Sequence, residues 1–238
     1  MTDHIVTSYE QELKGLAAQI AEMGGLAEGL VADAVAALVR GDVGLAQKVI
    51  LTDTRLDRLQ RAVEEQAIRV IARRQPMAVD LRDIFGALRV SGDLERVGDL
   101  AKNIAKRVVA MGGNVLLKPV VVGVEHLADI ALEQLKHVLD AYTARSSEEA
   151  RAVRDRDDEI DALYTSLFRE LLTYMMEDPR NITFCTHLLF CAKNVERIGD
   201  HATNIAETVH FAITGEQFVE ERPKSDGTSS VPTTGVAG

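Results

Sequence analysis

Four pairs of acidic residues are the part of this sequence best suited to chemistry. Within each pair two carboxylates are four residues apart, and on a helix this spacing stacks both side chains on one face, about 5–6 Å apart. Carboxylates this close repel each other, so each pair costs stability unless a positive charge lies nearby. A single pair of this kind would be interpreted as part of a solvated polar face, but four pairs at equivalent places in both halves favour a bound metal ion or a basic side chain. The pairs are Asp53 with Asp57, Glu95 with Asp99, Asp157 with Asp161, and Glu196 with Asp200.

The positions of these pairs along the chain place them together in space. Asp57 and Glu95 are both 19 residues from Pro76, and Asp53 and Asp99 are both 23 residues from it. If Pro76 marks a tight connection between two antiparallel helices, all four carboxylates fall at one level of the hairpin. The last two pairs lie almost as evenly about a second proline. We therefore expect two clusters of four carboxylates.

Clusters made only of carboxylates suit hard cations such as Mg²⁺, Mn²⁺, Ca²⁺ or iron. We predict that divalent or iron ions bind at both clusters, with Fe, Mn, Mg or Zn as the candidate metals. The alternative is a salt-bridged seam in which Arg58, Arg96 and Arg197 neutralise the carboxylates. Asn103 and Asn204 lie one turn beyond the aspartates and are candidates for outer ligands or hydrogen-bond partners.

Long helices joined by short loops must position these pairs. Apolar residues recur every three or four positions, while glycines, prolines and capping residues divide the chain into six stretches. The sequence therefore predicts an all-α protein, with a weak point in the first helix at Gly24–Gly25. The predicted helices run approximately over residues 4–39, 42–74, 76–111, 119–144, 146–176 and 178–215.

The two halves of the chain repeat each other. Residues 93–99 (DLERVGD) correspond to residues 194–200 (NVERIGD), 101 positions later, and an Asn-Ile-Ala triplet follows both at the same offset. Upstream the offset becomes 104. We predict two copies of a three-helix unit, over residues 1–114 and 115–215. Residues 216–238, rich in Ser, Thr, Gly and Pro, are predicted to be a disordered tail.

Composition excludes several classes of protein. The chain has 238 residues, 46% of them hydrophobic, with 4% aromatic residues and no Trp, which disfavours an all-β fold. A net charge of −10 disfavours nucleic-acid binding. Two cysteines cannot form a disulfide framework, and neither a membrane span nor a signal peptide is evident. We expect a soluble protein of the cytoplasm.

The remaining conspicuous residues favour structural roles. We interpret His201 as a surface histidine and Cys191 as a buried thiol on an apolar stripe. Gly98 and Gly199 have no turn around them, so close helix packing, or room beside the carboxylates, explains them better than a phosphate loop. No phosphate-binding loop, nucleotide-binding motif or nucleophile with its base is present, and we do not expect an enzyme.

The repeated motif resembles a known family. The pattern E-R-[VI]-G-D-x-x-x-N, found in both halves, is similar to the signature of the PhoU family of phosphate-specific transport system accessory proteins. Residues 73–82 (RRQPMAVDLR) resemble that family's turn between its second and third helices. The second-half turn over residues 177–181 is shorter and has Asn181 in place of Asp80. The resemblance covers residues 5–215.

This resemblance implies a fold and a role. The fold would be two three-helix bundles related by a pseudo-twofold axis, with metal clusters on motifs that fall here on the four acidic pairs. The role would be non-enzymatic: an adaptor between a phosphate ABC transporter, through its ATPase subunit, and a sensor histidine kinase. Such a negative regulator keeps phosphate-starvation genes off when phosphate is plentiful. The protein would associate with the membrane only through these partners. It could also form a homodimer.

Two other functions are alternatives to this role. A metal-free helical scaffold needs only the salt-bridged seam. A carboxylate-bridged di-iron protein needs two Glu-x-x-His motifs on a four-helix bundle. The chain has one, Glu207 to His210, and the repeat places Lys106 and Val109 at the corresponding positions of the first half. Di-iron chemistry is therefore the weakest of the three.

Overall fold

The computed structural model describes residues 2–115 and 117–219, and helices account for the whole of its regular structure over these ranges. The all-α fold predicted from the sequence is confirmed. The helices are α1 (Thr2–Arg40), α2 (Val43–Arg74), α3 (Ala78–Ala110), α4 (Lys118–Ala144), α5 (Ser147–Arg154), α6 (Asp157–Glu177) and α7 (Ile182–Thr214), with the short 3₁₀ helix η1 (Pro179–Asn181) before α7.

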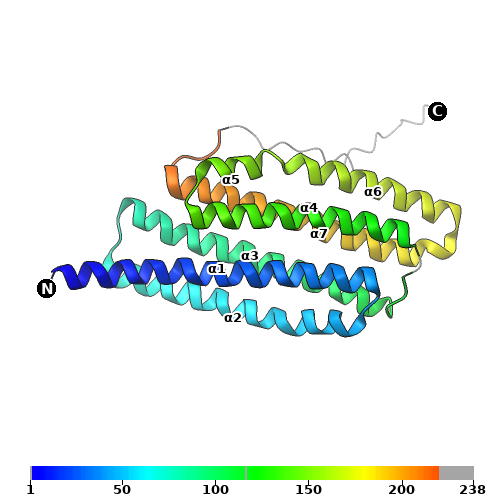
Figure 1. Ribbon diagram of the computed structural model, residues 1–238, viewed down its shortest axis with the longest axis horizontal. Coiled ribbons are helices and arrows are strands. Elements are labelled where there is room, and N and C mark those ends of the chain that lie inside the picture. Colours follow the sequence, from blue (N-terminus) through cyan, green and yellow to red (C-terminus); the bar gives the residue numbers. More distant parts are fainter. Residues whose placement is uncertain (1, 116, 220–238) are drawn as a thin grey trace, which may run out of the picture.

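The helices fall into two groups that follow the order of the chain (Figure 1). In the first group α1, α2 and α3 all pack against one another, and in the second α4 and α7 pack against each other and against both α5 and α6. The groups meet where α3 packs on α7 and α1 packs on α4. This grouping agrees with two three-helix units. Their pseudo-twofold relation and the boundaries at residues 114 and 215 stay predictions.

The stretch predicted as one helix over residues 146–176 is divided into α5 and α6 by a turn at Asp155–Arg156. Gln134, fully buried on α4, donates a hydrogen bond from Nε2 to the carbonyl of Arg156 at 3.0 Å. This contact satisfies a backbone oxygen at the interruption. At the start of α5, Ser146 Oγ accepts a hydrogen bond from the backbone N–H of Glu149 at 3.2 Å and so caps the helix.

The first helix is continuous through the glycine pair where the sequence suggested a bend or break. α1 runs unbroken for 39 residues. A Cβ atom added to Gly24 would lie 2.8 Å from Cδ1 of Leu139 on α4, closer than two carbons can approach. The glycine is therefore explained by close packing of α1 on α4 rather than by a break in the helix.

The core lies along the predicted apolar stripes. Thr52 and Leu59, which continue the three-or-four spacing along α2, are only half-buried. The residues that keep this spacing along α3 and α7 are all buried: Val90, Leu94, Val97, Ala101, Ile104 and Val108 on α3, and Phe184, Leu188, Cys191, Val195, Ile198, Ala202, Ile205 and Val209 on α7. Each fully buried leucine, isoleucine or valine contributes roughly 1.5–3 kcal/mol to folding. Cys191 is buried as predicted, and burial raises the pKa of its thiol to about 12.

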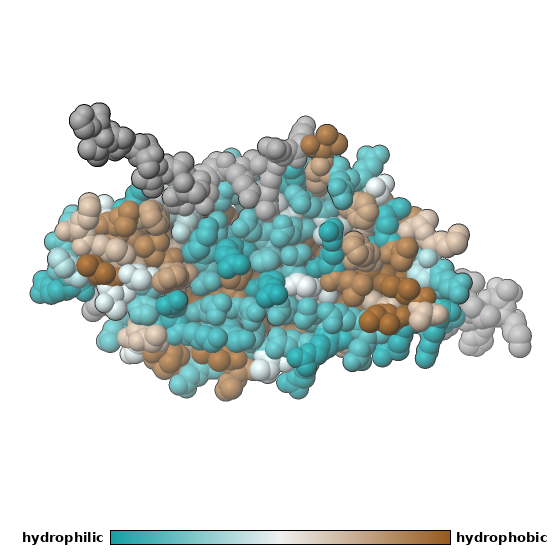
Figure 2. All heavy atoms as spheres, turned by 180° about the vertical axis from the view of Figure 1, so that it is seen from behind, coloured by the Kyte–Doolittle hydropathy of each residue, from teal (hydrophilic) through white to brown (hydrophobic). Residues whose placement is uncertain are grey.

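The surface is hydrophilic in the middle of the face shown in Figure 2, and hydrophobic residues gather towards its two ends. Both hairpin turns expose apolar side chains: Met77 at the α2–α3 turn and Met176 at the α6–α7 turn are each 79% exposed. These turns lie at opposite ends of the molecule (Figure 1). None of the described helices has an apolar stretch long enough to span a membrane.

Only the beginning of the predicted tail can be placed. Residues 216–219 follow α7 without regular structure, and the ring of Phe218 stacks on His210 with 4.2 Å between ring centroids. The rest of that predicted tail, residues 220–238, lies outside the described residues.

Candidate metal-binding clusters

The first cluster lies between α2 and α3, and its four carboxylates are close enough to affect one another. Burial raises the pKa of Glu95 most, and the negative charges of Asp99, Asp57 and Asp53 raise it further. Asp53 is only 1% exposed. The equal distances from Pro76 therefore placed these four residues correctly at one level of the hairpin.

A lysine that the sequence analysis did not single out lies inside this first cluster. Lys102 Nζ lies 2.6 Å from Asp53 Oδ2 and 3.2 Å from Asp99 Oδ1, so it joins α3 to α2. Burial raises the pKa of Asp53, although Lys102 acts to lower it. Arg96, which the salt-bridged alternative named, lies 3.5 Å from Glu95 and 3.7 Å from Asp99.

The second cluster lies between α6 and α7 and is more deeply buried. Burial raises the pKa of Glu196, Lys193 lowers it, and the charges of Asp200 and Asp161 raise it further. Lys193 Nζ lies 2.7 Å from Oε1 of Glu196. The other carboxylate oxygen, Oε2, is buried and has no hydrogen-bond partner.

Asp157, the fourth acidic residue of the second half, contacts a hydroxyl group. It is 5% exposed, and its Oδ1 accepts a hydrogen bond from Thr203 Oγ1 on α7 at 2.7 Å. The contact crosses between helices at the position where Lys102 contacts Asp53 in the first half. The two halves thus make equivalent contacts between neighbouring helices, through an ion pair in the first half and through a hydroxyl hydrogen bond in the second.

Two glycines allow the helices to approach closely beside the carboxylates. A Cβ atom on Gly98 would overlap the side chain of Leu56 and lie 3.1 Å from Asp53 Oδ1. A Cβ atom on Gly199 would overlap Ile160 in the same way. The expectation that these glycines serve close helix packing is confirmed.

The fit of a metal ion differs from one cluster to the other. Among the residues that the structure describes, no three acidic, histidine or cysteine side chains already form a ligand set for a metal ion. The oxygen donors of both clusters suit a hard cation. The unpartnered Oε2 of Glu196 is a buried oxygen that such an ion would satisfy, whereas Lys102 already lies against two carboxylates of the first cluster.

Two lysines that the sequence patterns did not predict as part of the site, Lys102 and Lys193, are the cations that contact the carboxylates most closely. Of the arginines expected to neutralise the carboxylates, Arg58 donates from Nε to the backbone oxygen of Thr54 at 3.1 Å, and Arg197 is exposed. A signal was present, because both lysines are three residues from an acidic residue of a pair, a spacing that brings side chains together on a helix.

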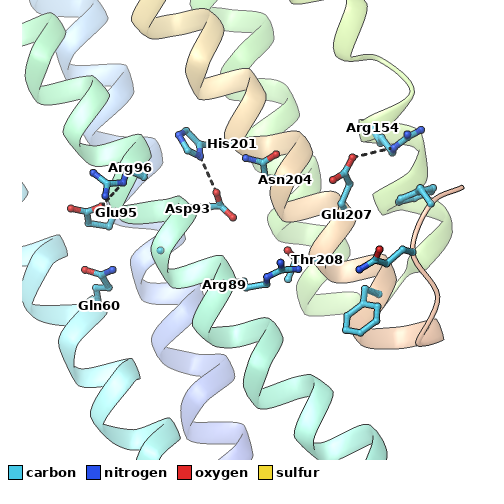
Figure 3. Close-up of a pocket in the computed structure, with 14 residues that line it drawn as sticks. Gln60, Arg89, Asp93, Glu95, Arg96, Arg154, His201, Asn204, Glu207 and Thr208 are labelled. Carbon is cyan, nitrogen blue, oxygen red and sulfur yellow. Dashed lines mark hydrogen bonds and ion pairs between the residues drawn. The ribbon is translucent and has the colours of Figure 1, made fainter. Parts of the chain in front are cut away.

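A polar cleft of about 720 Å³ lies between α3 and α7, and Glu95 of the first cluster is one of the residues that line it. Figure 3 shows Asp93 and His201 facing each other across it, and His201 Nδ1 lies 2.9 Å from Asp93 Oδ1. The side chain of His201 is only 16% exposed. The interpretation of His201 as a surface histidine is therefore wrong, because α3 packs close enough to cover it.

The one Glu-x-x-His motif is used in ion pairing and aromatic packing. Glu207 Oε1 lies 3.4 Å from Nε of the buried Arg154, an interaction drawn in Figure 3. His210 stacks under Phe218.

Comparison with known proteins identifies the family. The PhoU domain model matches the chain twice, over residues 20–108 and 124–209. The chain belongs to the PhoU family. Each match contains one half of the repeat and one carboxylate cluster, so the resemblance drawn from the paired motifs is confirmed.

Relatives match nearly the whole PhoU-family chain. A protein from Rhizobium meliloti (strain 1021) named "Phosphate-specific transport system accessory protein PhoU homolog" is 63% identical, over 96% of both chains. One with the same name from Caulobacter vibrioides (strain NA1000 / CB15N) is 53% identical, over 95% of this chain and 98% of its own.

Solved structures share the fold. The crystal structure of PhoU from Pseudomonas aeruginosa matches with a TM-score of 0.84 and 38% identity, covering 87% of this chain and 100% of its own. The phosphate transport system regulatory protein PhoU from Streptococcus pneumoniae matches with a TM-score of 0.81 and 28% identity, covering 88% of this chain and 99% of its own.

Proposed function

We propose that this protein is a non-enzymatic regulator of phosphate uptake that works with a phosphate-specific transport system. One observation carries the proposal: the 63% identity to an accessory protein of that system extends over 96% of both chains. Similarity of this extent includes both halves of the repeat.

The finer proposal is that the protein is an adaptor between the ATPase subunit of the transporter and a sensor histidine kinase, and represses phosphate-starvation genes. Two exposed apolar patches support an adaptor role. One surrounds the α2–α3 turn with Met77 and Val79, and the other surrounds the α6–α7 turn with Met176 and Ile182. Exposed apolar side chains at opposite ends of a long molecule suit contact with two partners.

We also propose that divalent or iron ions, with Fe, Mn, Mg or Zn as candidates, are the protein's cofactors. Their positive charge would offset the repulsion among carboxylates on facing helices. In the second cluster Asp161, Glu196 and Asp200 would hold the ion, because the charges of the two aspartates reach Glu196. The metal-free scaffold is the competing function, and the ion pairs of Lys102 favour it for the first cluster.

Deletion of the gene tests the regulatory role. We expect phosphate-starvation genes to switch on in high phosphate and phosphate uptake to rise, and both changes to reverse when the wild-type gene is restored. Purified protein should hydrolyse neither nucleotides nor phosphate esters. If the deletion strain keeps these genes repressed, and the protein captures neither the ATPase subunit nor a histidine kinase, the assignment is wrong.

Two matched variants test the adaptor role. Met77→Asp and Met176→Asp each place a charge at one exposed turn, where folding does not depend on the side chain. We expect each variant to lose capture of one partner and keep the other. Loss of both partners from either variant, or of neither from both, would contradict the assignment of one partner to each end.

A further inference from the structure

We propose that an apolar groove between the two groups of helices binds a medium-chain fatty acid, with the alkyl chain inside the groove and the carboxylate beside Lys14. The groove has a volume of about 410 Å³ and is lined by residues of α1, α3, α4 and α7. Its lining includes no residue of the carboxylate clusters or of the two exposed turns. The inference is therefore independent of the metal ions and of the role in phosphate transport.

The groove exists because α4 ends before the helix beside it does. α1 and α4 run alongside each other in opposite directions (Figure 1), and a Cβ atom added to Gly24 of α1 would lie 2.8 Å from Cδ1 of Leu139. Soon after that contact α4 ends at Ala144, whereas α1 extends further, to Thr2. One face of α1 is therefore left uncovered by α4 over the turns that precede Ala21.

Close packing of α3 on α7 forms the floor of the groove. A Cβ atom added to Gly86 of α3 would lie 3.3 Å from the Cβ atom of Ala212 of α7, so these two helices touch. Above this floor, Ala17, Ala18 and Ala21 of α1 contribute only methyl groups to the lining. Side chains this short leave open the space that larger ones would fill. The result is a channel that is closed at the α1–α4 contact and open at its other end.

The charged side chains lie at the open end. Arg145, which follows α4, and Asp83 of α3 form a two-pronged ion pair with distances of 2.9 and 3.0 Å, so their charges offset each other. Lys14 is exposed and forms no ion pair within the part of the chain that the structure describes. The mouth of the groove therefore carries one positive charge without a counterion. By charge complementarity, this mouth favours a ligand with an anionic end.

The interior of the groove is suited to hydrocarbon. Ile84 and Val209 are buried along its inner wall. Burial is the main reason why the pKa of Tyr142, which also lines the groove, is raised to about 12. A raised pKa of this origin indicates surroundings of low polarity, in which an apolar chain is more stable than in water.

The size and shape of the groove select the class of ligand. Its volume lies within the range of small-molecule sites, about 300–1,000 Å³. Lys14 is ten residues from Gly24, which corresponds to about 15 Å along α1. A helix of a partner protein, about 10–12 Å across with its side chains, does not fit a channel closed at one end. An unbranched alkyl chain does, and a carboxylate at its end would pair with Lys14.

A series of ligands tests the chemistry of the groove. Full-length protein, freed of lipid, is titrated in a calorimeter with octanoate, decanoate, decanol and decylammonium below the concentrations at which they form micelles. We expect decanoate to bind about tenfold more tightly than octanoate, because two more methylene groups leave water. Decanoate should also bind about two- to fivefold more tightly than decanol, as an exposed ion pair allows, and decylammonium should bind most weakly.

Matched variants locate the site. Ala21→Leu places a larger side chain near the closed end and should weaken decanoate binding by at least tenfold. Ala32→Leu is its control, because Ala32 is an exposed alanine of α1 outside the groove. Lys14→Gln should reduce the affinity for decanoate to that for decanol, whereas Lys106→Gln, an exposed lysine of α3, should not. Circular dichroism checks that each variant keeps the helix content of the wild type.

Three outcomes would overturn the proposal. If folded wild-type protein binds no decanoate, the groove is left for a segment of a protein. If decanoate binds equally well to folded Ala21→Leu and Ala32→Leu proteins, the fatty acid binds elsewhere. If decanol binds as tightly as decanoate, and Lys14→Gln changes neither affinity, the ligand is not an acid held by Lys14. None of these results bears on the regulation of phosphate uptake, which the gene deletion tests.

Discussion

Lys102 Nζ lies 2.6 Å from Asp53 Oδ2, and this ion pair joins α3 to α2 inside a cluster of four carboxylates. The aspartate is almost fully buried, whereas the lysine side chain is 26% exposed. Removing one partner of a buried pair costs about 3–5 kcal/mol. Because Lys102 is partly solvated, we expect Lys102→Met to lower the free energy of unfolding by about 2–3 kcal/mol.

Urea unfolding in metal-free buffer measures this effect. Lys106→Met, on the exposed side of α3, is the control and should change stability by less than about 0.5 kcal/mol. Adding Asp53→Asn to Lys102→Met removes the buried charge and should recover part of the loss. If Lys102→Met is as stable as the control, the ion pair contributes nothing to the hairpin.

The glycines beside the clusters allow a prediction with a control on the same helix. Gly98→Ala would force a methyl group into the fully buried Leu56, and Gly199→Ala would do the same to Ile160. We expect each to cost about 1–3 kcal/mol, as overpacking does. Gly92→Ala meets open space within 4 Å, and should stabilise α3 by about 0.5–1 kcal/mol.

Thermal or urea unfolding of the three variants distinguishes packing from helix propensity. Propensity alone would make all three alanine variants more stable than wild type. A stabilised Gly98→Ala protein would mean that α2 and α3 can move apart without loss, against the close packing seen here.

The sequence predicted most of the fold because its signals are local. Stripes of apolar residues and capping positions such as Ser146 set the helices, and they act within a few residues of one another. The cluster of Asp53, Asp57, Glu95 and Asp99 was also predictable, since a short turn at Pro76 converts equal distances along the chain into one level. Both kinds of signal can be recognised in the sequence without knowledge of the tertiary structure.

The features that escaped prediction depend on contacts between distant helices. The division of α5 from α6 coincides with a hydrogen bond from Gln134 on α4 to the carbonyl of Arg156. His201 is covered only because α3 packs on α7. Lys102 could have been noticed from its spacing to Asp99, but its contact with Asp53 depends on the close approach that Gly98 allows.

A histidine under the C-terminal segment makes stability depend on pH. Burial lowers the pKa of His210 most, and the charge of Arg151 lowers it further. The folded protein therefore binds this proton less readily than the unfolded chain, whose histidines titrate near pH 6.5. Stability from this group is fully present above about pH 6.5 and is lost as pH falls towards the lower folded pKa, by at most about 1.4 kcal/mol per pH unit.

Urea unfolding at about pH 7.5 and pH 5.5, on either side of the unfolded pKa, measures this loss. His210→Phe keeps an aromatic ring against Phe218 and should lose less stability than wild type on acidification. His187 is a second histidine whose pKa is lowered by burial. Because it is still present in the His210→Phe protein, the loss of stability that this variant retains on acidification includes the contribution of His187. An unchanged pH dependence in that variant would assign the whole effect to other groups.

The last prediction concerns the start of the predicted tail. Phe218 stacks on His210, and the guanidinium carbons of Arg154 and Arg151 lie 4.4 and 5.0 Å from its ring centroid. Packing of one aromatic ring with cation–π contacts contributes about 1–3 kcal/mol. A chain ending at Gly215 should therefore unfold at lower urea concentration than wild type, whereas a chain ending at Val219 should match it. Phe218→Ala in the full chain should reproduce most of the loss in the shorter one; if it does not, the backbone of residues 216–219 and not the ring holds this segment to α5 and α7.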